Sequence, residues 1–181
     1  MAFTVTALAE AQRRTEEQLQ TLIRRVDAMD RRLGRVETDV GDMRGQLLET
    51  RYRDRVGAYF GRLLRRVRVV SARDLDDLLD AATAAGAIDD ETAHELRLAD
   101  LIVRGRRPAD GQETYLAVEV SAGVGRDDVE RAVQRATLLS KLGPALPVVA
   151  GLRINAKAEA LAKGHGVWQM LDGRAIDPAA A

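Results

Sequence analysis

The most regular feature of the chain is a hydrophobic repeat in its first fifty residues. The positions recur at alternating spacings of three and four, and only Gln12 and Thr15 among them are polar: Val5, Leu8, Gln12, Thr15, Leu19, Leu22, Val26, Met29, Leu33, Val36, Val40, Met43 and Leu47. A repeat of 3.5 residues sustained over about six heptads predicts a left-handed coiled coil. About 44 residues would form a helix of roughly 65 Å, too long to be covered by one small domain. We therefore predict that residues 1–50 are a coiled-coil oligomerisation helix.

The charges that flank the repeat favour a parallel partner. In a parallel, in-register pair, each residue at heptad position g meets the position e residue five places further on in the other chain. The three central pairs are opposite in sign: Arg25 with Asp30, Arg32 with Glu37, and Asp39 with Arg44. We predict that the chain associates with itself, with a dimer favoured and a trimer or tetramer left open. A long helix that folds back over its own domain is the alternative.

Beyond Leu47 the pattern changes to short segments that are typical of an α/β domain. In chain order, we predict a helix over 51–64, a strand over 67–71, two inserted helices over 72–86 and 90–96, two hairpin strands over 98–104 and 115–121, a helix over 127–142, a strand over 147–152, a helix over 156–163 and a strand over 167–171. Ser71 and Asn155 are the predicted N-caps of two of the helices, and Asp89 or Asp90 is predicted to begin a third. The two inserted helices are predicted to have a structural role.

Composition narrows the functional classes. The chain of 181 residues has no cysteine, which excludes disulfides and thiolate metal sites and fits a reducing cytoplasm. It has no signal peptide and no apolar stretch of membrane-spanning length, so we expect a cytoplasmic protein. Its 28 basic and 28 acidic residues balance, so any contact with nucleic acid would need a local basic patch. The seven arginines between Arg51 and Arg68 are a candidate for such a patch, with an ordinary solvated face as the alternative.

Two carboxylates fall within the predicted hairpin. Asp100 lies in the strand LADLIVRG and Glu119 in the strand TYLAVEVS, and the turn residues from Pro108 to Gly111 predict that the two strands are antiparallel. Alternation along the second strand puts Glu119 and Ser121 on the same face. A glutamate in an apolar strand is costly to bury without a partner. A cation shared with Asp100 would supply one, and so would an arginine or a helix N-terminus.

From about Arg51 to Leu171 the chain resembles the PD-(D/E)XK nuclease-like superfamily. The resemblance is carried by Asp100 in LADLIVRG, by Glu119 in LAVEVS, by the segment DDVERAVQRATLLSKLG that follows, and by the order of the elements. It looks most like an uncharacterised bacterial branch in which such a domain follows a coiled coil. The resemblance implies an α/β fold, with a restriction endonuclease-like α-β-β-β-α-β core and a helical insertion over residues 51–176.

The resemblance also implies a metal site. In active members of the superfamily the Asp and the Glu ligate Mg²⁺, with Mn²⁺ as a substitute, and a lysine two residues after the Glu helps to activate water. Here Asp100 and Glu119 match the ligands, and the carbonyl of Val120 would be a third. Mg²⁺ prefers carboxylate and water oxygens and lowers the pKa of bound water. The lysine position holds Ser121, whose neutral hydroxyl cannot replace an ammonium group.

Three interpretations of this substitution stay open. In the first, a cation from elsewhere takes over the work of the lysine, with Arg126 and Arg131 in the following helix as candidates and Lys141 as a more distant one. In the second, the domain binds metal or nucleic acid without cleaving it. In the third, both activities are lost and the acids belong to a hydrogen-bond network.

The functional expectation follows from the resemblance. We expect a metal-dependent nuclease-like protein that acts on or binds DNA or RNA, with Asp100, Glu119, Ser121 and Arg131 as the candidate catalytic set. The alternative is a non-catalytic coiled-coil assembly or adaptor protein with a degenerate nuclease-like domain. A histidine metal site or a Ser-His-Asp triad has little support, because the only histidines, His94 and His165, lie in separate elements.

Overall fold

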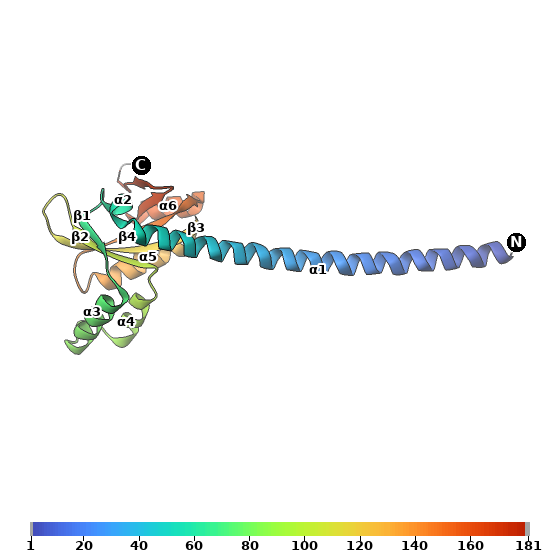
Figure 1. Ribbon diagram of the computed structural model, residues 1–181, viewed down its shortest axis with the longest axis horizontal. Helices are drawn as coiled ribbons and strands as arrows, with labels where there is room; N and C mark the ends of the chain where they lie inside the picture. Colours follow the sequence, from blue (N-terminus) through green and yellow to red (C-terminus); the bar gives the residue numbers. More distant parts are fainter. Residues whose placement is uncertain (1, 180–181) are drawn as a thin grey trace. The chain divides into compact units, whose positions relative to one another are not determined.

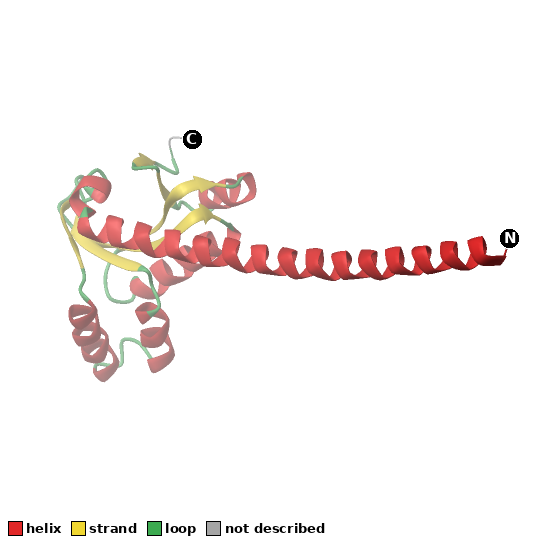
Figure 2. Cartoon of the chain, turned by 45° about the vertical axis from the view of Figure 1, so that its right-hand side comes forward, coloured by secondary structure: helices red, strands yellow, loops and turns green. Residues whose placement is uncertain are grey.

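A computed structural model describes the backbone of residues 2–179 and the side chains of residues 12–41 and 43–179. Helices and strands are interleaved along the chain (Figure 1 and Figure 2). The helices are α1 (Ala2–Asp54), α2 (Val56–Phe60), α3 (Ala72–Ala84), α4 (Asp90–Arg97), α5 (Arg126–Leu139) and α6 (Ala156–Gly164). The strands are β1 (Arg65–Val69), β2 (Leu101–Arg106), β3 (Glu113–Val124), β4 (Ala145–Ile154), β5 (Trp168–Leu171) and β6 (Arg174–Ile176). The predicted α/β class, with a long N-terminal helix before a mixed sheet, is confirmed.

The chain divides into two compact units, residues 1–43 and residues 44–181. The first unit is formed by α1 alone. In the described part of the repeat, every apolar position from Leu19 to Leu47 is at least 39% exposed. The side chains of Val5 and Leu8 lie outside the described residues. Helix α1 therefore carries a row of apolar side chains that its own chain leaves uncovered.

The second unit is built around one six-stranded sheet with the strand order β1-β2-β3-β4-β5-β6. Strands β1, β2 and β3 are antiparallel neighbours, β4 and β5 run parallel to β3, and β6 returns antiparallel to β5. The predicted hairpin is confirmed, with Leu101 opposite Val118 and Arg106 opposite Glu113. A parallel connection needs a crossover, and α5 supplies it between β3 and β4.

Both faces of the sheet are covered because the side chains of each central strand alternate. On one face, Val118 and Val120 of β3 pack with Tyr52 near the end of α1 and with Phe60 of α2. On the other face, Ala117 of β3 packs with α3, α4 and α5, and a neighbouring cluster joins α5 and α6 to β4. The phenolic O–H of Tyr52 lies 3.3 and 3.2 Å from the carbonyl oxygens of Gly151 and Met170. Burial raises the pKa of this tyrosine to about 12, which keeps its hydroxyl protonated.

The local signals that begin the helices are confirmed. Ser71, Asp89 and Asn155 each accept a hydrogen bond from the backbone N–H three residues further on, at 3.1, 2.8 and 2.9 Å. The predicted helix over 51–64 is instead the end of α1 followed by the short helix α2, and β1, β2, β3 and β4 begin two or three residues away from their predicted starts. Helix α5 ends at Leu139 rather than at residue 142, and the three-residue strand β6 was not predicted. Within the described residues, no helix is long and apolar enough to cross a membrane.

Candidate functional site

Glu119 lies in β3, and Asp100, which the sequence placed in a strand, is the residue just before β2 begins. Because Leu101 is opposite Val118, Asp100 falls opposite Glu119 in the antiparallel register. The Oδ2 atom of Asp100 accepts the backbone N–H of Val120 at 2.7 Å. The side chain of Asp100 therefore satisfies a donor of β3 just beyond the end of the β2 ladder. This hydrogen bond gives the aspartate a structural role in holding the two strands together.

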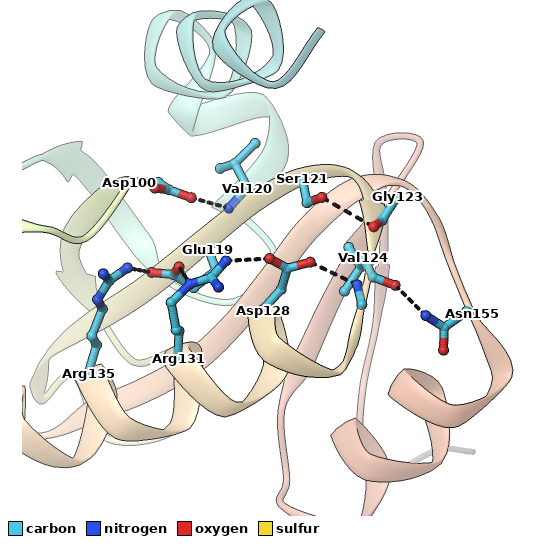
Figure 3. A network of polar contacts seen from close by, with 11 residues as sticks. Asp100, Glu119, Val120, Ser121, Gly123, Val124, Asp128, Arg131, Arg135 and Asn155 are labelled. Carbon is cyan, nitrogen blue, oxygen red and sulfur yellow. Dashed lines mark hydrogen bonds and ion pairs between the residues drawn. The ribbon is translucent and has the colours of Figure 1, made fainter. Parts of the chain in front are cut away.

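Glu119 is only 1% exposed and points toward α5, where two arginines meet it (Figure 3). The Nε atom of Arg131 lies 2.9 Å from Oε2 of Glu119, and Nη1 of Arg135 pairs with Oε1. Arg135 is itself buried, with a side chain that is 7% exposed. Each carboxylate oxygen thus has its own guanidinium partner. We call these three residues, Glu119, Arg131 and Arg135, the carboxylate clamp.

The start of α5 places one of these arginines. Asp128, in the first turn, accepts the backbone N–H of Gly125 at 2.8 Å through Oδ2. Its other oxygen pairs with Nη2 of Arg131 (Figure 3). Gly125 is the N-cap of α5 and has no side chain, and Asp128, the third residue of the helix, accepts the backbone N–H of this N-cap residue, which is one half of a capping box. Arg131 is held from two sides, by Asp128 and by Glu119.

The clamp counters an unfavourable environment for a negative charge. Burial is the largest effect and raises the pKa of Glu119, and the nearby charge of Asp100 raises it further. The hydrogen bonds from Arg131 and Arg135 act in the opposite direction and favour the carboxylate form. A buried glutamate beside a second acid is costly without partners. The two guanidinium groups therefore stabilise a carboxylate that the apolar surroundings alone would not keep ionised.

Two residues near the end of α1 also face this site. Burial raises the pKa of Glu49, and the charge of Asp100 raises it further. One turn later, Nη2 of Arg53 donates to the backbone carbonyl of Asp100 at 3.2 Å. Sequence analysis did not single out either residue. The spacing of four residues puts both on one helical face, but which strand that face meets depends on tertiary packing.

The remaining predicted site residues lie apart from the clamp. Ser121 donates from Oγ to the carbonyl of Gly123 at 3.2 Å (Figure 3), and Val120 contributes its N–H to Asp100 and its side chain to the core. Arg126 pairs with Glu130 at 2.7 Å on the exposed side of α5. Lys141 lies 3.4 Å from the hydroxyl of Thr92. Of the three cations weighed as replacements for a lysine, only Arg131 contacts Glu119.

This arrangement does not fit a divalent cation. Both oxygens of Glu119 pair with guanidinium groups, so a metal ion at this carboxylate would lie beside two positive charges. One oxygen of Asp100 is taken by the N–H of Val120. Among the residues that the structure describes, no group of three or more acids or histidines could hold a metal ion.

Arg135 is the residue of the carboxylate clamp that sequence reasoning missed. It lies four positions after Arg131, on the same side of α5, and beside the buried residue Ala136. Arginine usually marks a solvated position, so its burial could not be inferred from residue type alone. The available signal was the need of Glu119 for a partner, together with a second arginine one helical turn beyond the first.

Comparison with known proteins adds no assignment. The chain matches no protein-family model, no curated protein and no solved structure.

Proposed function

We propose that the protein is a self-associating coiled-coil protein that carries a non-catalytic, nuclease-like α/β domain. The observation that carries the proposal is the uncovered apolar row of α1. From Leu19 to Leu47 the a and d positions are all apolar, and their side chains are between 39% and 69% exposed. Fully burying a Leu, Val or Met side chain contributes about 1.5–3 kcal/mol. A second copy of the same helix supplies a matching surface, because it carries the same repeat.

Charge supports a parallel arrangement of two copies. In a parallel, in-register pair the three central flanking pairs from Arg25 to Arg44 are all opposite in sign. Each of these side chains is exposed in the single chain and free to reach a neighbouring helix. We take a parallel dimer as the proposed assembly.

The second unit supports the nuclease-like part of the proposal through its topology. The end of α1 and the elements β1, β2, β3, α5 and β4 follow the α-β-β-β-α-β order of the superfamily that the sequence resembles, and α3 with α4 forms the expected insertion. The non-catalytic part rests on the clamp. Both acids have partners within the fold, and a serine stands where the superfamily motif has a lysine. This arrangement agrees with the interpretation in which the acids belong to a hydrogen-bond network.

A disulfide test examines the parallel dimer. The chain has no cysteine, so a single introduced thiol reports on one position. We expect Leu33→Cys to form a covalent dimer under mild oxidation, because equivalent a positions face one another in a parallel pair. The measurement is the fraction of dimer on non-reducing gels.

The matched control separates the two orientations. In an antiparallel pair, a positions face d positions, so a pair in which Val26 meets Met29 would place position 33 opposite position 22 of the other chain. A mixture of Leu22→Cys and Leu33→Cys chains should then give the mixed disulfide, while Leu33→Cys alone should not crosslink. That pattern would refute the parallel arrangement. Thr38→Cys, at an outward-facing position, should stay monomeric on the gel in either case.

A metal-dependent phosphodiesterase is the second candidate. It is favoured by the nearness of Asp100 and Glu119, since the charge of the first raises the pKa of the second. The candidate ligands would be these two carboxylates and the carbonyl of Val120, with Mg²⁺ or Mn²⁺. It requires Glu119 to leave Arg131 and Arg135.

A cleavage assay distinguishes the two candidates. We expect no cleavage when the protein is incubated with single- and double-stranded DNA and RNA in Mg²⁺ or Mn²⁺. Both carboxylate oxygens of Glu119 are paired with arginines, so neither is open to a metal ion. The control is the Asp100→Asn, Glu119→Gln double variant, which keeps the size of both side chains. Cleavage by the original chain that this variant abolishes would establish the second candidate. Equal cleavage by both chains would show a contaminating nuclease.

A further inference from the structure

Two arginine-rich segments that are far apart in the sequence meet at one edge of the sheet. Strand β1 has the sequence RRVRV, and the end of β2 has the sequence RGR. In the antiparallel register Arg65 lies opposite Arg106, and Arg68 lies opposite Arg104. Like charges directly opposite one another in a sheet are destabilising. The fold nevertheless places two such pairs side by side, which indicates a use for concentrated positive charge.

The arginines line a hollow. A cavity of about 260 Å³ is lined by Gly105, Glu113 and four arginines, which we call the arginine groove: Arg66, Arg68, Arg104 and Arg106. A second cavity of about 360 Å³ shares Arg68 and Arg104 and is also lined by Asp74, Asp77 and Tyr115. The arginine groove therefore lies beside a second hollow of mixed charge, and Arg66 and Arg106 line only the groove.

Most of this charge has no partner inside the protein. Within the described residues, Arg66, Arg68 and Arg106 form no ion pair. Arg104 reaches Glu113 at 3.4 Å with one end of its guanidinium group, and both side chains of that pair are at least one-third exposed. The buried Nε atom of Arg104 has no hydrogen-bond partner among the described residues. A buried donor without a partner costs free energy, and an external anion would satisfy it.

The backbone around the groove is specialised. A bulge between Arg65 and Arg68 inserts an extra residue into β1, and Arg66 has a φ of 52°, which is uncommon for a residue other than glycine. A Cβ atom on Gly105 would come within 2.9 Å of the carbonyl oxygen of Arg65 and of the Cβ atom of Leu64. Glycine is thus required for the bulged strand to approach β2. Such local strain is characteristic of binding sites.

We propose that the arginine groove binds the phosphate backbone of a nucleic-acid duplex. Guanidinium groups bind phosphate oxygens with paired hydrogen bonds, so arginine suits this ligand better than lysine does. Single strands are bound mainly by stacking their bases on exposed aromatic side chains. None lines the groove, and Tyr115 in the neighbouring cavity is buried in the core. Contacts to phosphate alone are independent of base sequence. The expected ligand is therefore a duplex of any sequence.

This groove is separate from the carboxylate site. Arg106 is the last residue of β2, whereas Asp100 precedes its first. At about 3.3 Å per residue they lie about 20 Å apart along the strand. The proposal goes beyond self-association and uses neither the apolar row of α1 nor the clamp. A failure to bind the duplex would leave the coiled-coil proposal intact, and a monomeric chain would leave the duplex-binding proposal intact.

The test measures duplex binding by fluorescence anisotropy over a range of salt concentrations, with EDTA present to prevent cleavage. The variant is Arg66→Gln with Arg106→Gln, which removes two exposed charges that have no ion-pair partner. We expect about tenfold weaker binding at low salt and a salt slope that falls by about two, because each phosphate contact releases about one counterion. The matched control, Arg153→Gln with Arg174→Gln, removes the same charge from other exposed positions and should leave both quantities unchanged.

Several results would overturn the proposal. These are no binding of the duplex by the original chain, equal loss in the groove and control variants, or single-stranded DNA bound as tightly as the duplex. Binding to vesicles with anionic lipid but not to the duplex would overturn it in favour of a membrane. Thermal unfolding of both double variants should match that of the original chain, because all four arginines are exposed.

Discussion

Replacing Arg135 by methionine should lower the free energy of unfolding by about 3–5 kcal/mol at neutral pH, because it leaves a buried carboxylate without one of its two partners. Glu119 is 1% exposed, and Arg135 provides the partner that is itself buried. Methionine fills a similar volume, so the loss reports on charge more than on packing. The measurement is urea unfolding followed by circular dichroism at one fixed protein concentration, since association would also shift the transition.

The same helix offers a matched control. Arg126 pairs with Glu130 on α5, but the two side chains are 71% and 51% exposed. Exposed pairs contribute little, so Arg126→Met should cost far less stability than Arg135→Met. If Arg135→Met cost no more than Arg126→Met, the buried pair would not hold the fold together. The double variant Glu119→Leu, Arg135→Leu should be more stable than Arg135→Met, because it removes the buried charge altogether.

The loss of unfolding free energy in Arg135→Met should depend on pH. Burial, and then the charge of Asp100, raise the pKa of Glu119 above its ordinary value of 4.5. A folded chain with a raised carboxyl pKa binds the proton more tightly than the unfolded chain does. The contribution of this group is therefore greatest at low pH and falls as the pH rises from about 4.5 through the raised pKa. Arg135→Met removes a positive charge that favours the carboxylate form, so it raises the pKa of Glu119 further. The loss of stability caused by Arg135→Met should therefore become smaller as the pH falls.

Replacing Leu22 and Leu33 by lysine should convert the protein to a monomer at micromolar concentration. Both residues belong to the uncovered apolar row, and each is 55% exposed in the single chain. Each fully buried leucine contributes about 1.5–3 kcal/mol, and in a dimer both copies lose two of them. The added lysines would also place like charges in the seam. Sedimentation equilibrium measures the result.

The control for this experiment adds the same charge to the same helix. Gln20→Lys with Thr38→Lys changes outward-facing heptad positions, and this variant should remain associated. A monomeric original chain would defeat the proposed assembly. Equal dissociation of both variants would show that added positive charge, rather than loss of the apolar seam, separates the helices.

Local signals were the most predictable part of the fold. The caps depend on residues within one turn: Ser71 and Asn155 are confirmed, and of the two candidates Asp89 and Asp90 the structure has Asp89. The hairpin was also predictable, because turn residues between two apolar runs leave few other arrangements. Strand β6 was missed because three residues carry no periodic pattern, and its pairing with β5 exists only in the folded sheet.

The two acids could be placed from the sequence, but most of their surroundings could not. Alternation along β3 put Glu119 and Ser121 on one face, and an arginine was named in advance as one kind of partner for the glutamate. Which arginine reaches it depends on how α5 lies across the sheet, and that is a long-range property. The same reason explains why the meeting of Arg68 with Arg104 was not foreseen, since 36 positions separate them.

The bulge in β1 has a further consequence for how copies of this protein meet. The outer edge of a sheet presents unpaired backbone groups that invite pairing with another chain and lead to aggregation. Here one edge strand is bulged and lined with arginines, and the other, β6, is only three residues long. Both edges are thus poor templates for sheet extension. Copies of the chain can therefore associate through the apolar row of α1 without pairing their sheet edges.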